Sequence, residues 1–153
     1  MSEIFQVSDL LNSMVRLEKT GYDFYTKMAA ESADTKISSF FNFLANEEKK
    51  HEKIYINLSN EYKNGLSIDE TLDDDYKSYL NVLIKQNFAF DNLKRPTLKE
   101  ALKFSISLEK DTLLYVNEIQ IIFKNEKADV FSRIKQEEES HLKMLSEYSQ
   151  KNL

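Results

Sequence analysis

One pattern of residues occurs twice in this sequence, in copies that lie about 90 residues apart. The stretch RLEKTGYDFY around Glu18 resembles SLEKDTLLYV around Glu109, with an offset of 91 residues. The stretch NEEKKHEKI around Glu48 resembles QEEESHLKM around Glu138, with an offset of 90 residues. An internal repeat at a nearly constant offset indicates duplication, so we expect two equivalent structural units within one fold.

Each copy consists of a glutamate followed, 30 or 29 residues later, by a Glu-x-x-His motif. The first motif joins Glu48 to His51 and the second joins Glu138 to His141, and these are the only two histidines in the sequence. Three residues turn a helix by about 300°, which leaves both side chains of a motif on one face, one turn apart. The two side chains of each motif can therefore reach a common ion.

The sequence predicts that both copies are helical. Only two glycines and one proline occur among 153 residues, which leaves few of the breaks that β hairpins and βα turns need. Apolar residues recur at helical spacing, and 41% of the residues are hydrophobic, enough to bury the core of a single domain. We expect one all-α domain over residues 1–153, with long helices over about 8–32, 35–63, 97–125 and 127–150.

Two short turns and one long connector join these helices. We expect the first helix to begin with Ser8 as its N-cap and the second to end near Gly65, a residue suited to the left-handed conformation. The connector, about 66–96, contains the apolar stretch YLNVLI, which predicts a short extra helix. Thr97 and Glu100 form a T-x-x-E capping box before the third long helix. This order predicts a four-helix bundle of two antiparallel hairpins joined by a crossover.

The glutamates of the repeat interrupt apolar stripes that should face the core. Residues four and seven positions away on either side of each one are mostly apolar or aromatic, as Leu11 and Tyr25 are around Glu18. The neighbouring Glu47, Glu137 and Glu139 fall outside these stripes and serve as internal controls. Four buried carboxylates repel one another and are costly to desolvate, so they need protons or cations. Two divalent cations would balance four glutamates and two neutral imidazoles.

Helical geometry places the candidate ligands at the same height in the bundle. Glu18 and Glu48 both lie about 21 to 23 Å along their helices from the turn near Asp34, and Glu109 and Glu138 are at comparable heights in the second hairpin. The sequence therefore predicts a dinuclear metal site. Mixed carboxylate and imidazole ligands suit iron or manganese. Zinc is a further alternative, although it would not explain a set of six ligands.

Composition excludes several other classes. The net charge is −5 with lysines scattered among the acids, so no basic stripe indicates a nucleic-acid partner. No basic and apolar leader or long apolar run indicates secretion or a membrane span, so we expect a soluble, cytoplasmic protein. The absence of cysteine excludes disulfides, thiolate catalysis and iron–sulfur clusters, and leaves oxygen and nitrogen as metal ligands.

The residues around the candidate ligands resemble the rubrerythrin family of the ferritin-like diiron superfamily, and the resemblance covers nearly the whole chain. Its signals are LEK…FY in the first helix and LANEEKKH in the second. The resemblance implies a ferritin-like bundle that holds two iron ions, with Glu48 and Glu138 bridging them. The ligands that it implies are Glu18, Glu48, His51, Glu109, Glu138 and His141.

The sequence departs from the family pattern in two places. Rubrerythrins that reduce peroxide typically carry a second glutamate three residues after the third-helix ligand, where this chain has Thr112. Asp111 beside it points about 100° away. The rubredoxin domain is also missing, because no cysteine is present to hold its iron, so we expect electrons to come from a separate donor protein.

The resemblance implies an oxidoreductase that reduces hydrogen peroxide or O₂, as a homodimer or small homo-oligomer. Tyr25, seven residues after Glu18, is a candidate hydrogen-bond donor beside the metal ions, and an ordinary core tyrosine is the alternative. Two other functions remain open. One is a ferroxidase or iron-storage protein, which Thr112 favours, and the other is a metal-free helical interaction module.

Overall fold

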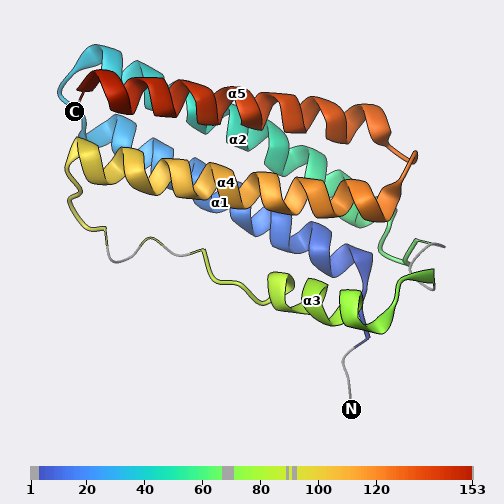
Figure 1. Cartoon of the computed structure of the whole chain (residues 1–153). Coiled ribbons are helices and arrows are strands. Elements are labelled where there is room, and N and C mark those ends of the chain that lie inside the picture. Colours follow the sequence, from blue (N-terminus) through green and yellow to red (C-terminus); the bar gives the residue numbers. More distant parts are fainter. Residues whose placement is uncertain (1–3, 67–70, 89, 91–92, 153) are drawn as a thin grey trace.

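A computed structural model of the chain contains five helices and, in the residues that it describes, no strand (Figure 1). The structure describes residues 4–66, 71–88, 90 and 93–152. The prediction of an all-α fold is confirmed. The helices are α1 (Val7–Glu31), α2 (Thr35–Glu61), α3 (Asp74–Ile84), α4 (Leu98–Phe123) and α5 (Ala128–Asn152).

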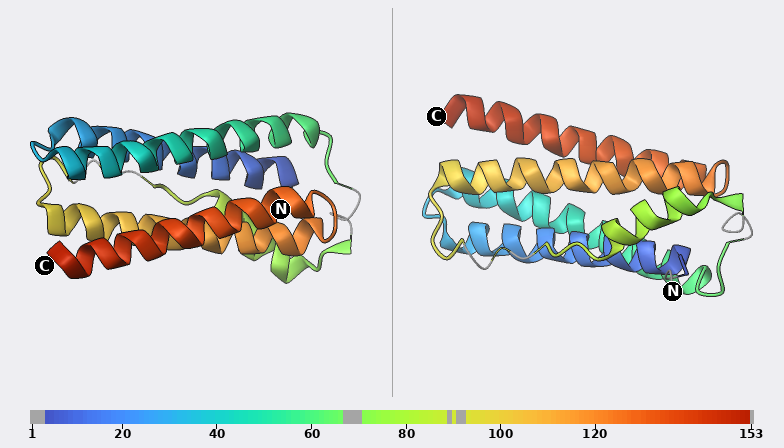
Figure 2. Two further views of the ribbon diagram at one scale, coloured as in Figure 1. Left: turned by 90° about the horizontal axis from the view of Figure 1, so that it is seen from above. Right: turned by 60° about the horizontal axis from the view of Figure 1, so that its bottom comes forward.

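The four long helices form two antiparallel hairpins that lie side by side (Figure 2). Helices α1 and α2 form the first hairpin, α4 and α5 form the second, and α1 packs against α4. The connector carries the short helix α3 along the outside of α1 before the chain enters α4 (Figure 1). The predicted four-helix bundle with a long crossover and an extra helix is therefore confirmed. Residues 67–70, 89 and 91–92 of the connector lie outside the described residues.

Local sequence explains where two of the long helices begin. Asp34 is the N-cap of α2, and its side chain accepts hydrogen bonds from the backbone N–H groups of Lys36 and Ile37. Thr97 is the N-cap of α4 and forms the predicted capping box with Glu100, in which each side chain bonds the backbone of the other residue. These caps fix both helix starts at the same end of the bundle.

The start of α1 differs from the prediction. The helix begins at Val7 with Gln6 in the N-cap position, and no side chain caps it, so Ser8 lies inside the helix. Val7 is fully buried, so packing of its side chain against the core, and not a side-chain cap, determines this start. Gly65 has a φ of 93° after α2, the left-handed conformation expected at this position.

Buried apolar residues form two separate clusters, one toward each end of the bundle. The first includes Leu17 and Tyr55, and the second includes Phe24 and Phe41. Glu18 follows Leu17 directly in α1, so it stands between the two clusters. The glutamates and histidines of the repeat therefore form a polar layer across the middle of an otherwise apolar core.

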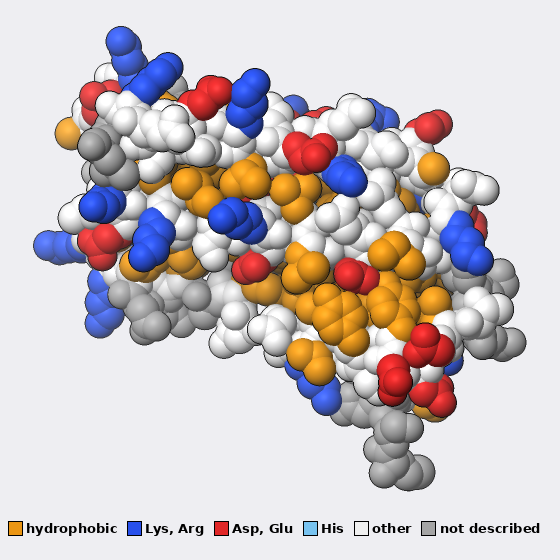
Figure 3. Space-filling model, in the orientation of Figure 1, with side chains coloured by type: hydrophobic (Ala, Val, Ile, Leu, Met, Phe, Trp, Pro, Cys, Tyr) orange, Lys and Arg blue, Asp and Glu red, His pale blue; other side chains and the backbone are white. Residues whose placement is uncertain are grey.

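Helix α3 covers part of this core and leaves apolar side chains exposed beside it. Its backbone accepts hydrogen bonds from the Tyr115 hydroxyl at Leu83 and from the Arg16 guanidinium at Ile84, over 2.6 and 2.7 Å. Figure 3 shows apolar side chains gathered over α3 and the adjacent part of α4. The exposed large apolar residues of these two helices are Tyr79, Val82, Leu114 and Ile121.

No helix in the described part of the chain is both long enough and apolar enough to cross a membrane.

Candidate metal centre

Six side chains converge in the polar layer and form two groups of possible metal ligands. Within each group, one ligand atom from every residue lies within 4.8 Å of the others. Glu48 and Glu138 belong to both groups, which is the arrangement that two bridging carboxylates require. The groups are Glu18, Glu48, His51 and Glu138, and Glu48, Glu109, Glu138 and His141.

The chemistry of this donor set fits two divalent cations. All six side chains are buried, with exposed fractions of 2% or less. Both oxygens of Glu18 and of Glu138, and one oxygen each of Glu48 and Glu109, have no hydrogen-bond partner among the described residues. Buried polar atoms are almost always satisfied, and unsatisfied carboxylates are especially costly. A pair of cations would satisfy these oxygens together and cancel their charge.

Both histidines direct the same ring nitrogen into the cluster. The Nδ1 atom of His51 lies 2.6 Å from Glu138, and the Nδ1 atom of His141 lies 3.3 Å from Glu138 and 3.6 Å from Glu48. Neither Nδ1 atom has a hydrogen-bond partner among the described residues. Each Nδ1 is thus available to a metal ion, while the Nε2 atoms face outward.

The outward Nε2 atoms face two acids of the opposite hairpin, Glu137 and Glu47. The Nε2 atom of His51 lies 2.6 Å from Glu137, and that of His141 lies 4.0 Å from Glu47. Helical periodicity places both acids outside the core face of their own helix. Each acid nevertheless lies on the outer side of a histidine ring from the other hairpin. As the sequence predicts, Glu47, Glu137 and Glu139 lie outside the buried layer, and none of them belongs to a ligand group. An acid that holds the second nitrogen of a metal-binding histidine fixes the orientation of its ring.

The protonation of the cluster shows where positive charge is needed. Burial and the charge of Glu48 raise the pKa of Glu18 and of Glu109 well above the ordinary value. Burial also favours the neutral form of each histidine, but contacts with Glu138 outweigh it and raise the pKa of His51 and of His141 to about 9. Without metal ions, protons therefore occupy the places that cations would fill.

Glu138 is the exception among the buried carboxyls. Burial alone would raise its pKa, but contacts with Glu109, His141 and His51 outweigh burial and lower the pKa well below the ordinary value. Glu138 is therefore the anion around which the protons of the cluster are arranged. Because Glu138 belongs to both ligand groups, its negative charge would stabilise two cations at once.

Tyr25 contacts a candidate ligand directly. Its hydroxyl donates a hydrogen bond of 2.8 Å to Glu109, and the residue is fully buried. Burial and the charge of Glu109 raise the pKa of Tyr25 well above the ordinary value, so the hydroxyl keeps its proton and remains a donor. The hydroxyl therefore donates to one of the candidate ligands, and its role beside metal ions stays a prediction.

Gly21 makes room for one of the shared carboxylates. A Cβ atom at this position would lie 2.8 Å from Oε2 of Glu48, closer than van der Waals contact permits. Gly21 lies in the middle of α1, where glycine weakens a helix relative to alanine. Glycine at this position therefore lowers the stability of the helix but leaves room for the side chain of Glu48.

Thr112 occupies the position where peroxide-reducing rubrerythrins are expected to carry a further glutamate. The residue is buried, and its hydroxyl donates a hydrogen bond of 3.1 Å to the backbone oxygen of Leu108 in the preceding turn. Its polar atom is thus satisfied within α4. Asp111 beside it is exposed and is not in either ligand group.

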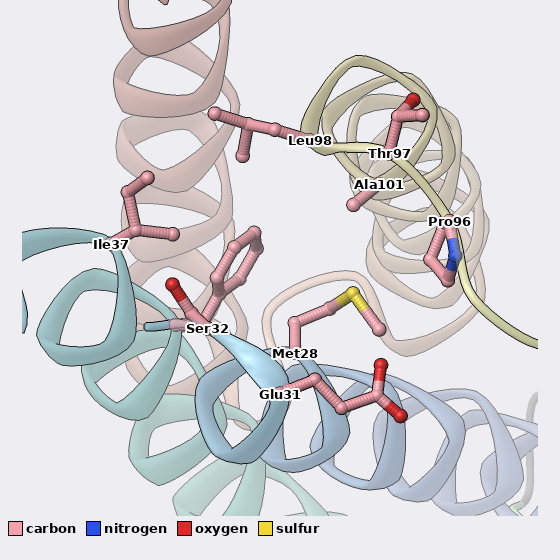
Figure 4. Close-up of a pocket in the computed structure, with 9 residues that line it drawn as sticks. Met28, Glu31, Ser32, Ile37, Pro96, Thr97, Leu98 and Ala101 are labelled. Carbon is pink, nitrogen blue, oxygen red and sulfur yellow. The ribbon is translucent and has the colours of Figure 1, made fainter. Parts of the chain in front are cut away.

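A pocket of about 180 Å³ opens at the end of the bundle where α1, α2 and α4 meet, away from the ligand groups (Figure 4). Met28 and Ala101 lie on its walls, and Glu31 is its one acid. Phe41 also lines it and stacks on Tyr25, with 6.1 Å between ring centroids. Contacts therefore run from this pocket through Phe41 and Tyr25 to Glu109.

Three residues around the site were not identified by helical periodicity. Glu47 and Glu137 stand at the same place in each copy of the repeat, and that equivalence is the signal that could have revealed them. Tyr55 has a buried hydroxyl without a partner among the described residues. It follows Glu48 by seven residues, just as Tyr25 follows Glu18, but its position in an apolar stripe made it look like core packing.

Comparison with known proteins bears on the fold and on the family of the chain. The solved structure of a candidate ferritin-like diiron-carboxylate protein from Thermotoga maritima matches the fold with a TM-score of 0.71, 24% sequence identity and 100% of both chains covered. A search of proteins with curated descriptions gave no match. The family model for rubrerythrin matches residues 9–149, nearly the entire chain. The chain therefore belongs to the rubrerythrin family.

Proposed function

We propose that this protein is a diiron oxidoreductase that reduces hydrogen peroxide with electrons from a separate donor protein. The observation that carries the proposal is the buried set of four carboxylates and two imidazoles, in two groups that share Glu48 and Glu138. Membership of the rubrerythrin family supports it. Residues 1–153 contain no cysteine and so hold no iron site of the rubredoxin type, which is why we assign the supply of electrons to a separate protein.

In this proposal each ion has two ligands of its own, and two further carboxylates are shared by both ions. Two ferrous ions would supply two electrons and the positive charge that polarises an O–O bond. Manganese is the alternative metal. The assignment is Glu18 and His51 for one ion, Glu109 and His141 for the other, and Glu48 and Glu138 for both.

The residues of the chain have three tasks in this reaction. Reduction of one peroxide molecule to two water molecules consumes two electrons and two protons. The apolar clusters at either end exclude bulk water from the polar layer. Tyr25 holds the Glu109 carboxylate through its hydroxyl. Glu137 contacts His51 and is 36% exposed, so we assign to it the transfer of protons between solvent and the buried layer.

The test begins with the metal content of protein that is produced with iron and purified without oxygen. We expect about two iron ions per chain, as in other diiron bundles. The reduced protein should then be oxidised rapidly by hydrogen peroxide and more slowly by O₂. Glu48→Ala and Glu138→Ala should abolish this iron-dependent peroxide consumption, whereas Glu139→Ala, an exposed neighbour, should leave it unchanged. Normal turnover in the first two variants would contradict the proposal.

Thr112 favours a second candidate, a ferroxidase or iron-storage protein, because the additional glutamate of peroxide-reducing rubrerythrins is missing. Storage requires a hollow particle of many subunits, whereas the oxidoreductase should be a homodimer or small homo-oligomer. The exposed apolar side chains on α3 and α4 support association with a second copy. Particle mass by light scattering separates the two candidates: a cage supports storage, and a small oligomer supports the oxidoreductase.

A further inference from the structure

Tyr55 is a fully buried tyrosine whose hydroxyl has no hydrogen-bond partner among the described residues. It lies in α2, four residues after His51 and seven after Glu48, so its side chain shares their helix face. Burial and then the charges of Glu18, Glu138 and Glu48 raise the pKa of Tyr55 well above the ordinary value. The hydroxyl therefore keeps its proton and remains available as a hydrogen-bond donor on the helix face that carries Glu48 and His51.

Tyr25 provides the contrast. It also lies seven residues after a candidate ligand, but its hydroxyl is already bonded to Glu109. The two tyrosines approach the polar layer from opposite ends, because Tyr25 belongs to one apolar cluster and Tyr55 to the other. Among charged groups, Glu109 affects Tyr25 most and Glu18 affects Tyr55 most. Tyr25 thus bonds Glu109 of one ligand group, whereas Tyr55 lies one helical turn after His51 of the other group. Of the two tyrosines, only Tyr55 has a hydroxyl without a partner among the described residues.

Packing does not explain the hydroxyl of Tyr55. The residue at the equivalent position of the second hairpin is Leu145, and the equivalent of Tyr25 is Val116. Both are fully buried, so the fold accepts an apolar side chain at these positions. A phenylalanine would fill the same volume as Tyr55 without burying an unpaired donor. Buried donors without a partner in the protein are rare unless water or a ligand completes them.

We propose that the Tyr55 hydroxyl donates a hydrogen bond to a small anionic ligand that enters the centre on the side of Glu18 and His51. The chemical class is an anion of two or three atoms with an exposed lone pair, such as the hydroperoxide anion, for which azide is a stable probe. This inference rests on the proposed function, since it requires the centre to hold metal ions. It makes the two metal positions unequal, with the exogenous ligand at the position beside Tyr55.

The test compares azide binding by the iron-loaded, oxidised wild type with that by Tyr55→Phe and Tyr115→Phe. Azide is titrated and followed by visible absorbance, and iron per chain is measured on the same samples. We expect Tyr55→Phe to keep its iron and to bind azide about tenfold more weakly, the loss expected for one hydrogen bond to a charged group. Tyr115→Phe, the matched control, should change azide affinity by less than about twofold, because its buried hydroxyl bonds the backbone oxygen of Leu83 and the residue is in neither ligand group.

Equal azide affinity in Tyr55→Phe and wild type would overturn the inference. Loss of iron affinity in Tyr55→Phe without a specific loss of azide affinity would also overturn it, because the hydroxyl would then serve Glu18 and not an exogenous ligand. If the wild type consumes peroxide, either of these results for Tyr55→Phe leaves the proposed function intact. A wild type that binds no iron overturns both proposals.

A second measurement gives its main result in the wild type and so does not depend on the folding of a variant. The resonance Raman bands of bound azide should shift between H₂O and D₂O, because the proposed hydrogen bond carries an exchangeable proton. The shift should persist in Tyr115→Phe and vanish in Tyr55→Phe. Bands that do not move in the wild type would overturn the inference.

Discussion

The Nε2 atom of His51 lies 2.6 Å from a carboxylate oxygen of Glu137, and the two residues belong to different helical hairpins. The same ring directs Nδ1 toward Glu138. One hairpin therefore supplies the histidine and the other supplies the acid that orients it. Each hairpin contributes candidate ligands to the centre, and the second hairpin in addition orients a histidine of the first.

Glu137→Ala should weaken metal binding about 10- to 100-fold, the usual effect of removing a partner that orients a metal-binding histidine. The measurement is a competition titration against a chelator with Co²⁺ or Fe²⁺. Glu139→Ala is the matched control, because Glu139 is an exposed acid of the same helix that lies outside both ligand groups. Equal metal affinity in the two variants would show that the contact with His51 has no role in holding the metal.

Gly21→Ala should have opposite effects on the metal-free and metal-bound protein. Alanine in the middle of a helix stabilises it by about 0.5–1 kcal/mol relative to glycine, so the free energy of unfolding of the metal-free protein should rise. The new Cβ atom would lie 2.8 Å from Oε2 of Glu48, so that carboxylate must move. Metal affinity should therefore fall by about tenfold or more, since a site tolerates shifts of only about 0.5 Å.

Denaturant unfolding and metal titration of the same samples measure both effects of Gly21→Ala. Thr26→Ala is a suitable control, because Thr26 is an exposed residue of the same helix. A variant at Gly21 that retains full metal affinity would mean that Glu48 can adjust without loss.

The metal-free protein should lose stability as the pH rises from 6.5 to 9. The pKa of His51 and of His141 is about 9 in the folded state and 6.5 ordinarily, so their contribution is complete below pH 6.5 and is lost through pH 9. The raised pKa of Glu18 and of Glu109 acts in the same direction, because the folded state favours their neutral forms. Glu138 has the opposite sign, and its contribution is lost only in acid.

Chemical unfolding of chelator-treated protein across this pH window measures the effect. Bound metal ions replace the protons, so the loaded protein should show a much smaller decline. A metal-free protein with a flat profile between pH 6.5 and 9 would contradict the predicted protonation of the cluster.

Tyr25→Phe should retain the metal ions and slow peroxide reduction by about 3- to 10-fold. The variant removes only the hydroxyl that donates to Glu109, and one hydrogen bond of this kind contributes about 1 kcal/mol. Stopped-flow oxidation of the reduced protein by peroxide gives the rate, and elemental analysis gives the metal content. Unchanged oxidation at full metal content would make Tyr25 an ordinary core residue.

The fold and the candidate ligands could be predicted from sequence because both depend on spacing within single helices. Glu18, Glu48, Glu109 and Glu138 occupy positions that helical periodicity assigns to the core, and the structure buries all four. The capping box at Thr97 is similarly local. Each of these features is determined by residues within a few turns of one another.

Features that depend on the packing of one helix against another could not be predicted in this way. A helical stripe places Glu137 outside the core face, and only the position of His51 in the opposite hairpin gives it a partner. The close approach of Gly21 to Glu48 likewise requires the separation of α1 and α2. The start of α1 at Val7 depends on burial against the core and not on a local cap.

The even division of ligands between the hairpins also bears on how the centre is assembled. Two identical hairpins around a two-fold axis would present the same six side chains, but such a complex would separate on dilution. The connector makes the second hairpin a neighbour at high effective concentration, so the centre can persist in a single chain at any dilution. Because the two hairpins belong to one chain, a residue of one hairpin can be substituted without the same substitution in the other. Tyr55 and its counterpart Leu145 are one such difference.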